Sequence, residues 1–231
     1  MADFGPHYCE TPTVIGGGFP VEPLNAISSG VIVLFGIAAL FLVMRRTPRA
    51  YELYALCGLL IVNGVGSILW HGLRTRWALT LDVAPALIFL LLVALIWARR
   101  IAPAWQVVAV GVGLVALSFA LRSIDLGLRL PGRWGAMAPL IVAAAAWLIA
   151  RSYAVFKPAA FYGAAALVSA SAALAFRTVD GGVCDALPTG THFLWHIFLS
   201  AAAFLSVLTV VSLTAVRSQT EVRAPAATSA Q

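Results

Sequence analysis

Long apolar runs separated by short polar or basic segments dominate the chain. An α-helix needs about 20 mostly apolar residues to cross a bilayer, and seven runs approach that length. They lie near residues 24–44, 53–71, 77–97, 104–121, 135–150, 158–176 and 190–216. The runs lack period-two alternation, so helices are favoured over the strands of a membrane barrel. The pattern predicts an all-α integral membrane protein built as a seven-transmembrane helix bundle.

The composition agrees with this interpretation. The 231 residues are 61% hydrophobic and 10% charged, with a mean hydropathy of +0.95, far from the balance of a soluble globular domain. The net charge of +6 does not indicate nucleic-acid binding, because the basic residues gather at the ends of apolar runs, where they anchor spans. The expected partner is a membrane lipid, and the sequence does not indicate an oligomeric state. Lys157 is the only lysine, which hints at a bacterial source and an inner-membrane location.

Seven spans place the two termini on opposite sides of the membrane. The first residues lack the basic and apolar regions of a cleavable signal peptide, so the first span is expected to direct insertion. With the N-terminus outside, nine of the 15 basic residues fall in inner segments. These are Arg45, Arg46, Arg49, Arg99, Arg100, Arg151, Lys157, Arg217 and Arg223. Such an excess favours an outer N-terminus and a cytoplasmic C-terminus.

The chain therefore divides into three segments. Residues 1–23 form an outer N-terminal segment, residues 24–216 form the seven-helix domain, and residues 217–231 form a polar tail that is expected to be disordered. Cys9 and Cys184 fall in polar segments on the same predicted outer side, where a disulfide could form. Two unpaired thiols are the alternative, since connectivity does not follow from sequence.

A few polar residues interrupt the apolar runs at similar depth. His71 closes the second span, Asp82 lies about one and a half turns into the third, and His192 and His196 lie in the first turns of the seventh. Ser67 precedes His71 by four residues, so the two share one helix face, as do the two later histidines. Ionisable residues inside a membrane are costly and mark functional sites. Their convergence predicts a metal site.

Three neutral imidazoles with an open fourth position are typical of catalytic zinc, whereas structural zinc favours four ligands and cysteine. Zinc would lower the pKa of a bound water to about 7. Asp82 would hold or deprotonate that water, or act as a fourth ligand, and Ser67 could donate to the water or to an oxyanion. Taken singly, Asp82 could instead pair with Arg74 or Arg76, and Ser67 could bond its own helix backbone.

The motifs resemble those of a known family. A Ser-x-x-x-His motif, an aspartate eleven residues later and a His-x-x-x-His motif opening the seventh span resemble the alkaline ceramidases, seven-helix membrane hydrolases related to adiponectin-receptor-like proteins. The Cys9-Glu10 pair and the segment 22–28 resemble the ceramidase branch. The resemblance implies a zinc-dependent amidase that hydrolyses ceramide or a related N-acyl lipid to a fatty acid and a sphingoid base. It implies zinc ligation by His71, His192 and His196, catalytic assistance by Asp82 and Ser67, and a disulfide between Cys9 and Cys184.

The resemblance also raises the question of calcium. Eukaryotic members carry a calcium site in an Asp-Trp-x-Glu-x-Asn segment, and the corresponding stretch here runs from His7 to Pro12 with two of those positions replaced. Glu10 and Glu22 remain as candidate calcium ligands. The alternative function is a seven-helix lipid receptor or binding protein with a structural metal site. Measurable turnover would separate the two functions.

Overall fold

A computed structural model describes residues 5–13, 18–123 and 138–228 of the chain. These residues form seven α-helices and one short 3-10 helix, which confirms the all-α prediction. The helices are α1 (Pro23–Arg46), α2 (Tyr51–Leu73), α3 (Arg76–Ile101), α4 (Ala104–Ser123), α5 (Ala138–Val155), α6 (Lys157–Val179), η1 (Asp180–Gly182) and α7 (His192–Thr228).

Five of the described helical segments are long and apolar enough to cross a membrane. They are Pro23–Arg46, Tyr51–Leu73, Arg76–Ile101, Lys157–Gly182 and His192–Gln219. These five confirm the expectation of a multi-pass membrane protein. The apolar parts of α4 and α5 that the structure describes are shorter, Ala104–Leu117 and Leu140–Val155, so seven crossings remain a prediction.

Two boundaries differ from the sequence-based expectation. Helix α5 spans Ala138–Val155 rather than residues 135–150, and the first expected residues lie outside the described part of the chain. Helix α7 continues to Thr228, whereas a disordered tail was expected from residue 217. Gln219, Glu221, Arg223 and Ala224 have favourable helix propensities. The same segment contains Pro225, which disfavours a helix interior, so propensity accounts for only part of this extension.

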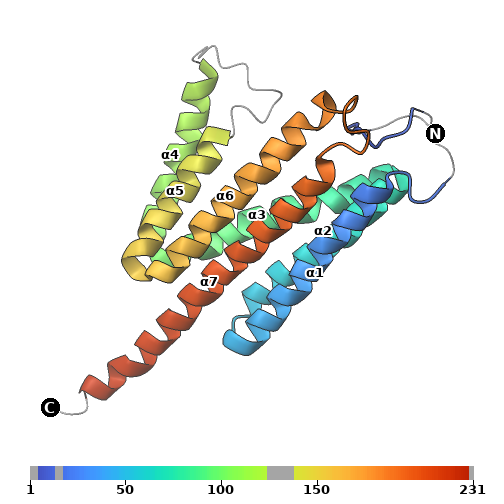
Figure 1. Ribbon diagram of the computed structural model, residues 1–231. Coiled ribbons are helices and arrows are strands. Elements are labelled where there is room, and N and C mark those ends of the chain that lie inside the picture. Colours follow the sequence, from blue (N-terminus) through green and yellow to red (C-terminus); the bar gives the residue numbers. More distant parts are fainter. Residues whose placement is uncertain (1–4, 14–17, 124–137, 229–231) are drawn as a thin grey trace.

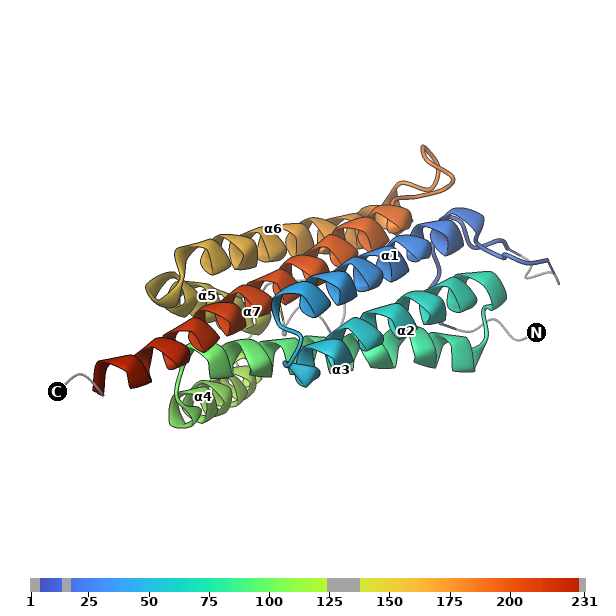
Figure 2. The ribbon, with the colours of Figure 1, turned by 90° about the horizontal axis from the view of Figure 1, so that it is seen from below.

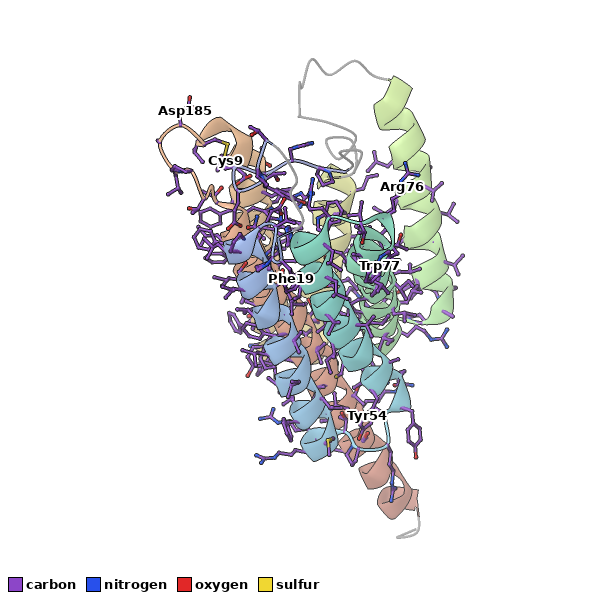
Figure 3. All side chains as sticks on the ribbon, turned by 90° about the vertical axis from the view of Figure 1, so that its right-hand side faces the viewer. Cys9, Phe19, Tyr54, Arg76, Trp77 and Asp185 are labelled. Carbon is purple, nitrogen blue, oxygen red and sulfur yellow. A yellow bond between two sulfur atoms is a disulfide. The ribbon has the colours of Figure 1, made fainter. Side chains whose placement is uncertain are left out.

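Most of the helices pack side by side, and the C-terminal part of α7 extends beyond the others (Figures 1 and 2). Helix α7 packs against α6 and α1, α2 packs between α1 and α3, and α5 packs on α6 (Figures 1 and 2). Cys9 and Asp185 lie at one end of this bundle and Tyr54 lies at the other (Figure 3). We call these the disulfide end, which carries Cys9 and Cys184, and the far end, which carries the connection between α1 and α2.

The far half of the bundle holds the apolar core. Buried side chains from α1, α2, α3 and α7 meet there without charged residues among them. They include Ala39, Val43, Leu53, Leu56, Cys57, Leu60, Trp97, Val207, Val210, Val211 and Leu213. Burial of apolar surface at about 25 cal/mol per Å² stabilises the contacts among these helices. The core therefore fixes the relative positions of the helices that carry the polar residues of the disulfide end.

Candidate metal centre

The three histidines at membrane depth meet in the structure. His71 lies in the last turn of α2, and His192 and His196 lie in the first two turns of α7. All three are buried, and one potential ligand atom from each lies within 4.8 Å of the others. Within the described part of the chain, they are the one group of three or more His, Cys, Asp or Glu residues placed to hold a metal ion. The predicted grouping of the histidines is confirmed, and the identity of the metal stays a prediction.

Glu22 holds the ring of His71. This fully buried residue precedes α1, and its carboxylate accepts a hydrogen bond from Nδ1 of His71. The backbone N–H of Glu22 also donates to the carbonyl of His71 at 2.9 Å. Arg74 and Thr11 complete its surroundings, with Arg74 Nη1 at 3.2 Å and Thr11 Oγ1 at 2.6 Å from Oε1. With Nδ1 engaged, Nε2 is left to bind a metal, an arrangement typical of zinc-bound imidazoles.

A serine on α1 holds the ring of His196 in the same way. Ser28 Oγ lies 2.8 Å from Nδ1 of His196 and 3.1 Å from the carbonyl oxygen of Asn25. The Ser28 hydroxyl donates to that carbonyl and accepts from Nδ1–H, which satisfies both groups. Ser29 Oγ lies 3.5 Å from the same ring nitrogen. His196 therefore also presents Nε2 as its metal ligand.

Asp180 fixes the start of α7 and hence the backbone of His192. Its Oδ1 accepts the N–H groups of Thr191 and His192 at 2.6 and 2.9 Å, and its Oδ2 accepts the N–H of Cys9 at 3.2 Å. Gly190 has a φ of +63°, and a Cβ there would lie 2.8 Å from Cβ of Cys9. Glycine is required at this position because both the backbone conformation and the close approach disfavour a side chain.

The Cys9–Cys184 disulfide is present in the structure, which confirms the predicted pairing. It anchors the N-terminal segment at the disulfide end and places Tyr8 against the histidines. The Tyr8 ring stacks on that of His192, with 3.8 Å between the centroids and 22° between the planes. Burial raises the pKa of the Tyr8 hydroxyl, so this group stays protonated at neutral pH and can donate a hydrogen bond.

Two imidazole nitrogens without a hydrogen-bond partner indicate that the three histidines fit a metal ion. His71 Nε2 and His192 Nδ1 are buried and have no hydrogen-bond partner in the described part of the chain. Leaving a buried polar atom unpaired costs about 1 to 3 kcal/mol, and such groups call for an explanation. A metal ion bound to both nitrogens would remove the cost. Three buried imidazoles match the ligands of catalytic zinc, so the site fits the expected ion.

Close packing of α2 and α3 brings Asp82 and Ser67 beside the histidines. A Cβ on Gly66 would lie 2.7 Å from the backbone nitrogen of Asp82, so only glycine allows this approach. Asn63 Nδ2 donates to the carbonyl oxygen of Asp82 across the same contact. Ser67 and His71 both lie close enough to the Asp82 carboxylate to act on it. The structure thus groups the predicted residues, and their catalytic roles stay predictions.

The structure also bears on the alternative partner of Asp82. Among the described residues, Asp82 forms no ion pair with Arg74 or Arg76. Arg74 ends α2 with a φ of +52°, and its side chain donates to the carbonyl of Pro6 at 2.9 Å. Its guanidinium carbon also lies 4.2 Å from the ring centroid of Trp70. Arg74 therefore joins the segment before α1 to the end of α2.

The two candidate calcium ligands have other partners in the structure. Glu10 accepts the N–H groups of Leu24 and Asn25 at 2.6 and 2.8 Å, which caps the start of α1. Glu22 holds His71, as described above. Neither glutamate belongs to a second cluster of three or more His, Cys, Asp or Glu residues within the described chain. Calcium binding stays a prediction without added support.

The partners of the histidine rings were not identified from the sequence. Glu22 and Asp180 look like ordinary carboxylates next to helix ends, and their buried contacts join residues far apart in the chain. A signal was present on the first span, where Asn25, Ser28 and Ser29 recur at helical spacing in an otherwise apolar run. Such a polar stripe on one face of an apolar helix indicates that this face meets polar groups of its neighbours.

Comparison with known proteins does not assign the chain to a family. No protein-family model matches the sequence. A comparison with curated proteins gives no match either. The functional argument therefore depends on the residues of the site and on the resemblance of their motifs.

Proposed function

We propose that the protein is an intramembrane zinc-dependent amidase that hydrolyses ceramide or a related N-acyl lipid to a free fatty acid and an amine. The supporting observation is the buried group of His71, His192 and His196, with unpaired ring nitrogens beside Asp82 and Ser67. The resemblance to alkaline ceramidases points to the same chemistry. A lipid substrate suits a site carried on apolar helices, since the bilayer gives lateral access and the helix walls can hold an acyl chain.

The residues around the histidines divide the reaction between them. Zinc held by the imidazoles would act as a Lewis acid and lower the pKa of water. Asp82 accepts a proton from the attacking water and returns it to the leaving nitrogen. Ser67 donates a hydrogen bond to the oxygen on which negative charge develops. Ser29 Oγ lies 3.1 Å from Ser67 Oγ and keeps that hydroxyl in place.

The proposal includes the topology. The chain crosses a bacterial inner membrane seven times, with the disulfide end outside and the far end in the cytoplasm. The Cys9–Cys184 bond supports this orientation, because disulfides form in oxidising compartments. The last turns of α1 and α3, at the far end, carry Arg45, Arg46, Arg99 and Arg100, in keeping with the excess of basic residues on the cytoplasmic side.

Asp82→Asn is the experiment that tests the function. Asparagine keeps the shape of the side chain but cannot accept a proton, so the variant should retain about one zinc per chain and lose about 100-fold or more in kcat. The wild-type protein and the variant are purified in detergent, their zinc is measured by elemental analysis, and both are assayed against ceramide and other N-acyl lipids. Glu52→Gln is the control, because it also replaces a carboxylate by its amide but lies at the far end of the bundle, and it should leave both the zinc content and kcat unchanged.

The outcomes separate the candidate roles of Asp82. Loss of zinc from Asp82→Asn would make this residue a metal ligand, and full zinc with unchanged turnover would remove it from the reaction. Wild-type protein that holds zinc and hydrolyses none of the lipids would contradict the amidase proposal. That result would favour the alternative of a binding protein with a structural metal.

A further inference from the structure

Arg177 is a charged residue that the proposed reaction does not use. It lies in the last turn of α6, at the disulfide end, and its side chain is partly buried. Its guanidinium carbon lies 5.0 Å from the ring centroid of Trp195 and 5.8 Å from that of Tyr8. Aromatic faces hold a guanidinium in place but leave its N–H donors unused. Arg177 forms no hydrogen bond or ion pair with another described residue.

This guanidinium stands next to the histidine centre. The Tyr8 ring that it faces is stacked on His192, and the Asp82 carboxylate is near enough for the charge of Arg177 to act on it weakly. The guanidinium carbon of Arg74 also lies 5.9 Å from the centroid of the Tyr8 ring, but the charge of Arg74 is balanced by the buried Glu22. Among the described residues, Arg177 is therefore a cation beside the site that forms no ion pair with a carboxylate.

The position of Arg177 indicates which part of a substrate it would meet. The acyl chain of an N-acyl lipid would lie along the apolar helices, so the amine half would point toward the disulfide end. Hydrolysis of a neutral lipid such as ceramide would release an ammonium group near Arg177, and like charges at close range repel. An amine half with an anionic group would instead meet five N–H donors suited to carboxylate or phosphate.

We infer that Arg177 recognises an anionic group on the amine half of the substrate, so the preferred substrates are N-acyl amino acids or N-acyl phosphoamines rather than neutral ceramides. The inference depends on the proposed amidase function. The anionic group sits beside Tyr8 and Trp195 and pairs with the guanidinium, while the scissile amide lies at the histidines. Arg177 is thereby a specificity-determining residue, and Asp82 and Ser67 keep the roles proposed above.

Pairs of substrates that differ only in charge test the inference. N-oleoylglycine is compared with N-oleoylglycinamide, and N-oleoylphosphoethanolamine with N-oleoylethanolamine. A charged hydrogen bond predicts a kcat/KM about 10- to 100-fold higher for the anionic member of at least one pair. The pair that shows the preference identifies carboxylate or phosphate as the ligand. Arg177→Gln should remove the preference and change kcat/KM for the neutral members by no more than about twofold.

Four controls keep the result interpretable. Arg76→Gln removes a positive charge from the same end of the bundle and should retain the preference, and Arg177→Lys should retain part of it. Zinc content of about one per chain in Arg177→Gln shows that the variant is folded. Binding of the four lipids to zinc-loaded Asp82→Asn, measured through Trp fluorescence, gives the same comparison without turnover. Arg177→Gln in that background should weaken binding of the anionic lipids alone.

Different results would contradict the inference about Arg177 and the proposed amidase function. Equal kcat/KM for charged and neutral members, or a preference for the neutral ones, would overturn the inference and leave an amidase. An equal loss on all substrates in Arg177→Gln would also overturn it, because the residue would then act on the reaction centre. If no lipid is hydrolysed, the proposed function fails, and equal binding of charged and neutral lipids would then refute the role of Arg177 as well.

Discussion

The disulfide end and the far end of the bundle are built from the same helices and are stabilised in different ways. At the far end, α1, α2 and α7 meet through side chains such as Val43, Leu56 and Val210. At the disulfide end, the same three helices bury polar residues. These include Asn25, Ser28, Ser29, Ser67, His71, His192 and His196. Apolar contacts are non-directional, whereas each buried polar group needs a particular partner, so single contacts decide the geometry of the site.

The ion pairs of the two ends show the same difference. At the far end, Glu52 pairs with Arg100, and the Glu52 side chain is 43% exposed. Exposed pairs of this kind contribute about 0 to 1 kcal/mol. At the disulfide end, Glu22 is fully buried between His71 and Arg74, where loss of one partner leaves an uncompensated charge. Equivalent substitutions at the two ends should therefore have different consequences.

The largest difference is expected from the histidines and the apolar core. Replacing His71, His192 or His196 by alanine removes a metal ligand, so bound zinc should fall from about one per chain to near zero and activity should fall below detection. Leu56→Ala, at the far end, should lower the stability by about 2 to 5 kcal/mol and keep the zinc. Zinc is measured by elemental analysis and stability by thermal unfolding in detergent.

Two results would contradict this difference between the histidine variants and Leu56→Ala. Full zinc in all three histidine variants would show that these residues are not the ligands. Loss of zinc from Leu56→Ala in protein that is still folded would show that the site depends on the apolar core as a whole. Either result would contradict the division between the two ends.

The sequence predicted those features of the two ends of the bundle that follow from local patterns of residues. Apolar runs gave α1, α2 and α3 to within a few residues, and four-residue spacing grouped His192 with His196 on one face of a helix. The contacts of Glu22 and Asp180 could not be predicted in this way, because they join residues 49 and 12 positions apart in the chain. Packing of distant helices decides such contacts, and a single sequence contains no direct record of it.

The disulfide is expected to have the next largest effect. Cys9 and Cys184 are 175 residues apart, and in the entropic account a loop of this length stabilises the folded state by about 4 to 5 kcal/mol. The double variant Cys9→Ala with Cys184→Ala should unfold at a correspondingly lower denaturant concentration. It should also bind zinc more weakly, because the segment that packs against His192 is released.

Cys57 provides the control for this prediction. It is a buried free cysteine of α2 that packs in the apolar core, so Cys57→Ala breaks no disulfide and alters a site away from the histidines. Its effect should be limited to the packing of the far half. If the double variant and Cys57→Ala have the same stability and the same zinc affinity, the tether does not hold the site.

Glu22→Gln is expected to have an intermediate effect. Glutamine keeps the size of the side chain and removes the negative charge that orients His71 and increases its basicity. Loss of such a partner typically lowers metal affinity by about 10- to 100-fold, measured by competition with a chelator at neutral pH. Glu52→Gln is the matched control at the far end, and its zinc affinity should equal that of the wild type. If Glu22→Gln and Glu52→Gln bind zinc with the same affinity, Glu22 does not contribute to the metal site.

The smallest effect is expected from Ser28, because a neighbour can replace it. Ser28→Ala removes the acceptor 2.8 Å from Nδ1 of His196, but Ser29 Oγ lies 3.5 Å from the same atom and can move closer. The single variant should lose little zinc affinity, whereas Ser28→Ala with Ser29→Ala should lose about 10-fold. Ser206→Ala is the control, since that hydroxyl on α7 donates to the carbonyl of Ala202 in its own helix. A double variant with wild-type affinity would show that His196 needs no serine partner, and that its orientation comes from helix packing as at the far end.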